Sequence, residues 1–204
     1  MQISSTSSIY QVTNQSSYSK NTDTDKNYLT MSLDDIKDLP YNEVKSNLED
    51  ISKNLNNKSE KNAKDSLEIF AVKAKIHTID GSNNQQYNQA LFNTLGEIDD
   101  PFSIIIFQKD IQNNLGDYHD NKNIKASFVV ESNTENYRSD NNLTKKQISN
   151  IDMGNFISKM LTTFTEDLSE AKGDKIKKQY QDIVDGYGLL QKYYNQAIKE
   201  PLYA

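Results

Sequence analysis

The chain has 204 residues, of which 35% are hydrophobic and 25% charged, and this length and composition fit one domain of ordinary size. The absence of cysteine excludes disulfides, thiolate metal ligands, iron–sulfur clusters and cysteine nucleophiles, because each of these needs a cysteine sulfur. The net charge of −6 repels phosphate backbones and anionic lipid head groups, so we expect the chain to bind no nucleic acid.

The first 30 residues differ in composition from the rest of the chain. Eighteen of them are Ser, Thr, Asn or Gln, which leaves too little apolar surface to bury in a folded core. We therefore predict a disordered tail over residues 1–30 and a single helical domain over residues 31–204. The sequence has no signal peptide of the charged-then-apolar type, and its apolar runs are far shorter than the roughly 18 residues of a membrane span. These features predict a soluble, cytoplasmic protein without a membrane span.

Helix start signals mark the beginning of the predicted domain. Ser32 and Asp35 have the spacing of a capping box, which predicts a short helix after Ser32. Pro40 suits the first turn of a second helix, because apolar residues at helical spacing follow it. The predicted apolar stripe of this second helix consists of Val44, Leu48, Ile51 and Leu55.

Residues 64–79 fit two kinds of secondary structure. Leu67, Phe70 and Ala74 lie at helical spacing, whereas every second residue from Phe70 to Thr78 also fits a half-buried strand. We favour a helix because Ala and Lys, which are good helix formers, are frequent in this segment.

Two further helices are predicted in the middle of the chain. Turn-forming residues at 80–83 precede a helix that ends at Gly96. Asp100 and Pro101 then mark the start of a longer helix, as its N-cap and first helical residue. The run of three isoleucines at 104–106 indicates that this helix enters the core. Its predicted buried stripe consists of Ile104, Phe107, Ile111, Leu115 and Tyr118.

Residues 121–132 carry the clearest strand pattern in the chain, because every second residue from Ile124 to Val130 is apolar. A single strand needs a partner, and residues 69–79 could pair with residues 122–131. The predicted fold class is therefore mainly α, an irregular helical bundle, with a small two-stranded β-ribbon as the alternative for these two segments.

The last third of the chain predicts two helices joined by a turn. Asp152 can cap the first helix, Gly173 can end it, and Asp174 can cap the second. Because so short a connection makes the helices antiparallel neighbours, we predict a C-terminal antiparallel helical hairpin. Residues on one side of the second helix recur at alternating spacings of four and three, which is the pattern of a packed seam. The seam consists of Ile176, Tyr180, Ile183, Tyr187, Leu190, Tyr194 and Ala197.

This seam is also the predicted binding surface. Each tyrosine hydroxyl needs a hydrogen-bond partner, which a wet interface supplies more readily than a dry core. We expect either that the seam packs in the core of the chain itself or that it binds another protein or a second copy of the chain. The residues expected to make the partner contact are Tyr180, Tyr187, Leu190 and Tyr194.

Asp117, His119 and Asp120 form a candidate metal site, because they offer three possible ligands within four residues. His77 and Asp80 could add to it. A polar helix end with His119 near the C-terminal dipole explains the same residues without a metal. The sequence shows no catalytic triad, no phosphate-binding loop and no EF-hand spacing, so we expect neither a catalytic residue nor a cofactor.

These observations favour a non-enzymatic helical interaction or adaptor protein. The alternative is an exported protein, because a disordered polar leader before a cysteine-free helical body resembles the substrates of flagellar or type III-like export. Such a protein leaves the cell without a cleavable signal peptide. Metal binding centred on His119 is the second alternative.

Overall fold

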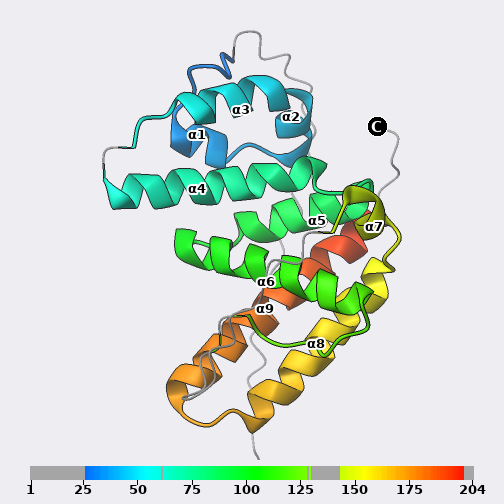
Figure 1. Cartoon of the computed structure of the whole chain (residues 1–204). Coiled ribbons are helices and arrows are strands. Elements are labelled where there is room, and N and C mark those ends of the chain that lie inside the picture. Colours follow the sequence, from blue (N-terminus) through cyan, green and yellow to red (C-terminus); the bar gives the residue numbers. More distant parts are fainter. Residues whose placement is uncertain (1–25, 61, 128, 130–142, 200–204) are drawn as a thin grey trace, which may run out of the picture.

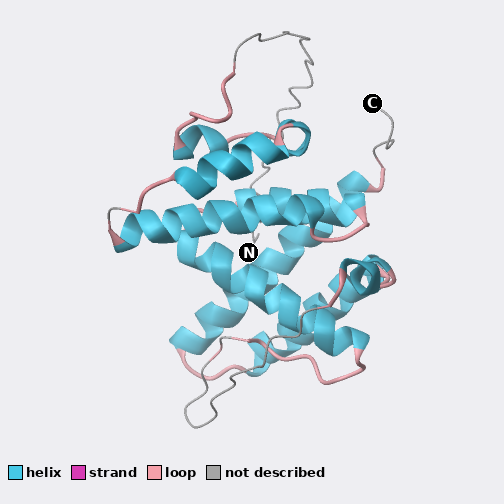
Figure 2. Ribbon diagram, turned by 45° about the horizontal axis from the view of Figure 1, so that its top comes forward, coloured by secondary structure: helices cyan, strands magenta, loops and turns pink. Residues whose placement is uncertain are grey.

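The structure is a computed structural model and describes residues 26–60, 62–127, 129 and 143–199. These residues form helices and connections, and none of them lies in a strand (Figures 1 and 2), so the prediction of a mainly helical fold is confirmed. Among the described residues, no helix is long and apolar enough to cross a membrane. The helices are α1 (Leu33–Lys37), α2 (Tyr41–Ser46), α3 (Leu48–Asn57), α4 (Ala63–His77), the 3-10 helix η1 (Thr78–Asp80), α5 (Gln85–Gly96), α6 (Pro101–His119), α7 (Lys145–Ser149), α8 (Met153–Glu170) and α9 (Asp174–Ala197).

The first three helices form a layer that covers one side of α4 (Figure 1). The Ser32 side chain accepts a hydrogen bond from the Asp35 backbone N–H over 3.1 Å, which confirms the predicted N-cap of α1. The predicted second helix is two helices, because the chain leaves helical geometry at Asn47. The Asn47 side chain donates a hydrogen bond to the Glu43 carbonyl oxygen, and such a local bond competes with the helical pattern.

Ordered contacts begin before the predicted domain boundary at residue 31. The Tyr28 hydroxyl donates a hydrogen bond to the Glu43 carboxylate over 2.9 Å, and the Asn54 side chain donates one to the Tyr28 carbonyl oxygen over 2.7 Å. The folded part of the chain therefore includes residues 26–30. The rest of the predicted tail, residues 1–25, lies outside the described residues.

Helix α4 separates two hydrophobic cores. Ala71 and Ala74 face the core formed mainly by α5, α6, α8 and α9, whereas Val72 and Ile76 face the smaller core under α1, α2 and α3. Because two faces are buried, the apolar residues form no single stripe, which explains why this segment also fitted a strand pattern. The helix is confirmed, but the predicted burial of Phe70 is wrong, because 57% of this residue is exposed.

Helix α6 begins as the sequence predicts. The Asp100 side chain accepts a hydrogen bond from the Ser103 backbone N–H over 2.8 Å, and Pro101 is the first helical residue. The prediction that all three isoleucines lie in the core is only partly correct. Ile104 is buried, whereas Ile105 and Ile106 are half-buried.

The predicted strand over residues 121–132 is absent from its described part, residues 121–127 and 129. The Ser127 backbone N–H instead donates a hydrogen bond to the Asp110 carboxylate of α6 over 2.7 Å. Ser127 is buried, although the alternating pattern places it on the exposed face. The proposed partner segment belongs to α4, so a β-ribbon between the two segments is wrong as well. The remaining predicted strand residues, 128 and 130–132, lie outside the described residues.

Helices α8 and α9 lie side by side and run in opposite directions (Figure 1). Asp152 caps α8, since its side chain accepts a hydrogen bond from the Asn155 backbone N–H over 3.0 Å. Gly173 precedes α9 with a φ of 87°, a left-handed conformation that glycine adopts without strain. The prediction that Asp174 caps α9 is wrong, because Asp174 is already the first helical residue.

The side of α9 that carries the predicted seam faces the larger core. Tyr187 and Leu190 are fully buried there, and Ala197 is buried near the end of the helix. A Cβ atom at Gly186 would lie only 2.6 Å from a ring carbon of Phe107, so this glycine makes room for the Phe107 ring of α6 against α9. Gly188 has no such neighbour.

Candidate functional site

The structure does not assemble the predicted metal site. Asp117 is buried on α6, whereas His119 ends this helix and Asp120 follows it. His119 Nδ1 lies 2.9 Å from one carboxylate oxygen of Asp120, and Lys122 Nζ lies 2.8 Å from the other. Hydrogen bonds from Lys122 and His119 hold the pKa of the Asp120 carboxyl below its ordinary value. This carboxylate already has two cationic or donor partners.

His77 and Asp80 do not complete a metal site either. His77 is exposed at the end of α4, and the Asp80 carboxylate pairs with Lys145 of α7. In the part of the chain that the structure describes, no three His, Asp or Glu residues are close enough to hold a metal ion.

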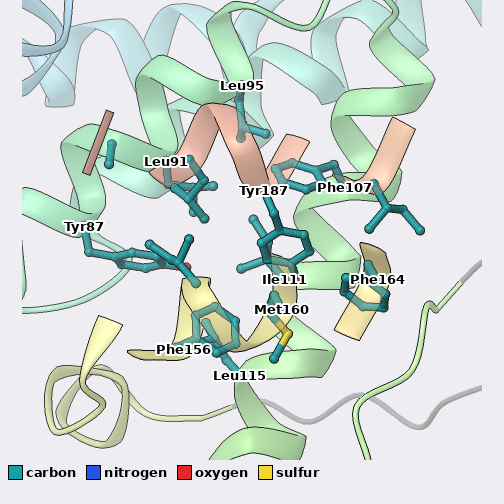
Figure 3. Packing of buried hydrophobic residues seen from close by; sticks show 14 of the residues in the cluster. Tyr87, Leu91, Leu95, Phe107, Ile111, Leu115, Phe156, Met160, Phe164 and Tyr187 are labelled. Atoms are coloured by element: carbon teal, nitrogen blue, oxygen red, sulfur yellow. The ribbon is translucent and has the colours of Figure 1, made fainter. Parts of the chain in front are cut away.

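The residues predicted to bind a partner lie mostly inside the chain. Tyr187 and Leu190 have no exposed surface, Tyr180 is buried, and Tyr194 is half-buried. In Figure 3, Tyr187 lies at the centre of the core, among side chains from α5, α6 and α8. Its ring centroid is 5.2 Å from that of Phe107 and 5.5 Å from that of Phe164. We expected the seam either to pack in the core of the chain itself or to bind a partner, and this arrangement corresponds to packing in the core.

A buried polar network surrounds the Tyr187 hydroxyl. The Tyr187 hydroxyl donates a hydrogen bond to the Asp110 carboxylate over 3.2 Å. The Asn114 side chain donates a hydrogen bond to the same carboxylate oxygen over 2.9 Å. Burial and the charge of Asp110 raise the pKa of Tyr187 well above its ordinary value. Because Asp110 also accepts the Ser127 backbone N–H, the network joins α6, α9 and the segment after α6.

A groove of about 980 Å³ lies beside α4 and α6, and we call it the α4–α6 groove. It is lined by residues of α3, α4, η1, α5, α6 and α7. Helices α4 and α6 lie against each other here, and the Gln108 side chain donates a hydrogen bond to the Ala74 carbonyl oxygen over 3.0 Å. Leu91, Ile111 and Leu115 contribute apolar surface to the groove, and all three are buried.

Some of the apolar residues that the core leaves uncovered line this groove. Among them are Phe70 of α4, which is 57% exposed, and the half-buried Ile105 and Ile106 of α6. An exposed aromatic side chain next to further apolar surface is typical of an interaction site in a folded protein. The groove therefore offers apolar surface to a binding partner.

Tyr87 provides a polar group without a partner in the same groove. The residue is only 3% exposed, and its hydroxyl has no hydrogen-bond partner among the described residues. Figure 3 shows its ring extending from α5 toward Phe156 and Tyr187. Burial raises the pKa of Tyr87, so the hydroxyl is protonated at neutral pH and can both donate and accept a hydrogen bond.

The charged residues of the groove are mostly basic. Lys73 and Lys109 line it, together with one acidic residue, Asp80, which pairs with Lys145. Lysines therefore outnumber acidic residues in this lining, although the whole chain has a net charge of −6. Such a groove favours an acidic occupant over a basic one.

No protein-family model, curated protein or solved structure matches this chain.

Neither the α4–α6 groove nor its lining was predicted from the sequence. Phe70 was placed in a buried stripe, and Ile105 and Ile106 were read as core because they belong to an apolar run. The signal in the sequence was the surplus of apolar residues on α6, since a single helical stripe accommodates only some of them.

Proposed function

We propose that this chain is a non-enzymatic interaction protein that binds an amphipathic, acidic helix of another protein in the α4–α6 groove. The observation that carries the proposal is the exposed ring of Phe70 beside a groove of about 980 Å³ whose lining contains more lysines than acidic residues. Burial of one large apolar side chain contributes roughly 1.5–3 kcal/mol, so the free energy of covering Phe70 is enough to matter for binding.

A helix is the occupant that fits the groove best. Two packed helices present a groove between their ridges, and an amphipathic helix inserts apolar residues spaced by three and four into such a groove. Phe70, Ile105 and Ile106 supply the apolar contacts, while Lys73 attracts carboxylates on the polar face of the occupant.

In this proposal the rest of the molecule is a rigid support for the groove. We interpret the described chain as an irregular bundle in which the α8–α9 hairpin braces α5 and α6. Tyr187 supports this role because its hydroxyl is hydrogen-bonded to Asp110 of α6 and its ring packs against Phe107. The seam of α9 therefore acts indirectly, by holding α6 in place.

Two exposed phenylalanines allow a matched test of the groove. Phe70 and Phe102 are both 57% exposed, but only Phe70 lines the groove. The probe is a fluorescent 18-residue peptide with leucines at helical spacing and glutamates elsewhere, and its binding to the full chain is followed by fluorescence anisotropy. We expect Phe70→Ala to weaken binding at least fivefold and Phe102→Ala to leave it within twofold.

A second peptide, with lysine in place of glutamate, tests the charge of the occupant. We expect it to bind at least tenfold more weakly than the glutamate peptide at low salt. The proposal is wrong if neither peptide binds, or if both alanine variants weaken binding equally. Light scattering at the same concentration shows whether the chain forms a dimer. If the chain is a dimer and the peptide does not bind, the proposal is also overturned, in favour of a second copy of the chain as the occupant.

Export and metal binding remain predictions from the sequence. The segment that motivates export, residues 1–30, falls mostly outside the described residues, and the candidate ligands near His119 are not brought together.

A further inference from the structure

Lys75 of α4 is a buried amine outside the α4–α6 groove. Only 7% of the residue is exposed, and its ammonium group donates a hydrogen bond to the Lys37 carbonyl oxygen over 2.8 Å. The Nζ atom also lies 4.3 Å from the centroid of the Phe92 ring. Lysine is rarely buried to this extent. Among the described residues, no carboxylate forms a salt bridge with Lys75.

A small cavity lies beside this amine. It has a volume of about 140 Å³ and is lined by Lys75, Gly96 and the apolar residues Val72, Leu95 and Ile104. A Cβ atom at Gly96 would lie 3.3 Å from Lys75 Nζ, so the missing side chain of this glycine leaves space next to the nitrogen. One water molecule occupies about 30 Å³ in the liquid, so the cavity holds a molecule of roughly four or five non-hydrogen atoms.

We propose that Lys75 is a carbonyl-reactive amine whose cavity takes a short, uncharged aldehyde of two to four carbons. The neutral amine attacks the carbonyl carbon, an N–C bond forms, and the carbonyl oxygen takes up a proton to give a carbinolamine. Loss of this oxygen as water then leaves an imine, so amine and aldehyde are converted to imine and water without an oxidant or reductant.

The electrostatic surroundings of Lys75 favour this chemistry. Burial, the largest cause, lowers the pKa of Lys75 to about 8, so a larger fraction of this amine is neutral at pH 7.5 than of an ordinary lysine. Lys37 lowers the pKa further, whereas Asp38 raises it. Three carboxylates also line the cavity, those of Asp34, Glu68 and Asp99, and they disfavour an anionic carbonyl compound.

Reductive labelling of the native full-length chain tests the proposal. The probe is propanal with sodium cyanoborohydride at pH 7.5, and peptide mass spectrometry measures the rate of propylation at each lysine. Lys64 is the internal reference, because it lies on the same helix and its side chain is 82% exposed. We expect Lys75 to be labelled at least tenfold faster than Lys64, and its rate to level off above pH 8 while that of Lys64 continues to rise.

Two controls separate a reactive site from general exposure. Gly96→Ala fills the space beside Nζ and is compatible with helical geometry, so labelling of Lys75 should fall at least fivefold while Lys64 is unchanged. Anionic glyoxylate should lose the preference for Lys75. The proposal is overturned if propanal labels Lys75 no faster than Lys64, if Gly96→Ala has no effect, or if glyoxylate is as selective as propanal.

Discussion

Lys75 makes the stability of the fold rise with pH, whereas a lysine in an ion pair makes it fall. Its pKa is about 8 in the folded chain and 10.5 for an ordinary lysine, so folding disfavours the charged form. Below pH 8 Lys75 is protonated in both the folded and the unfolded chain, so folding bears the full free-energy cost of burying its charge. Between pH 8 and 10.5 Lys75 is protonated only in the unfolded chain. The free energy of unfolding therefore rises with pH over this range, by about 3 kcal/mol at most.

This rise is measured by urea unfolding at pH 7, 8, 9 and 9.5, followed by far-UV circular dichroism. Above pH 10 stability falls again, because burial raises the pKa values of Tyr87 and Tyr187 in the folded chain. These phenols therefore lose their protons in the unfolded chain at a lower pH than in the folded chain, which favours unfolding. We expect Lys75→Met to remove the rise up to pH 9.5, whereas the exposed Lys64→Met keeps it. Parallel profiles for the wild type and Lys75→Met would contradict the assignment.

The hydroxyl of Tyr187 makes a second prediction at this scale. Tyr187→Phe removes one donor from the buried Asp110 carboxylate and should lower the free energy of unfolding by about 1–3 kcal/mol. Tyr194→Phe is the matched control on the same helix, because Tyr194 is half-buried, and it should change stability by less than about 0.5 kcal/mol. Equal effects in chemical denaturation would show that the network adds nothing.

At the scale of elements, the packing of the Phe107 ring of α6 against α9 depends on one glycine. Gly186→Ala places a Cβ atom 2.6 Å from the Phe107 ring, and we expect it to destabilise the fold by about 1–3 kcal/mol. Gly188→Ala meets no neighbour and removes a poor helix former, so it should stabilise the fold by up to about 1 kcal/mol. Thermal unfolding of the two variants checks this, and a stabilising effect of Gly186→Ala would contradict the close contact between Gly186 and the Phe107 ring.

Local signals in the sequence predicted helix starts well. Ser32, Asp100 and Asp152 cap helices as expected, because an N-cap depends only on residues within one turn. The buried seam of α9 also followed from its spacing, since one side of this helix faces one core.

Predictions that depend on distant residues were less successful. The alternating pattern after Asn121 indicated a strand, but Asp110 captures the backbone of Ser127 and no strand partner exists among the described residues. Phe70 fitted both the helical spacing and the strand pattern of its segment, yet it is exposed, because the two buried faces of α4 are formed by other residues. The candidate ligands near His119 were close in sequence, yet Asp117 points into the protein and Asp120 is engaged by Lys122.

At the scale of the whole molecule, two cores share α4 and α5. Phe92 of α5 packs in the smaller core, while Leu91 and Leu95 of the same helix pack in the larger one. Helix α4 is thereby held between two layers (Figure 1). Its residue Phe70 is left exposed and lines the same groove as residues of α6. The groove is a consequence of this arrangement.

Methyl NMR of the isoleucine-labelled chain, titrated with the leucine–glutamate peptide, tests the site of binding most directly. If the α4–α6 groove is the docking site, the signals of Ile105, Ile106 and Ile148 shift, because these residues line it. The signals of Ile176 and Ile183 on the α9 seam, and of the exposed Ile198, stay in place. Shifts concentrated at Ile176 and Ile183, or no shift at the groove residues, would contradict docking between α4 and α6.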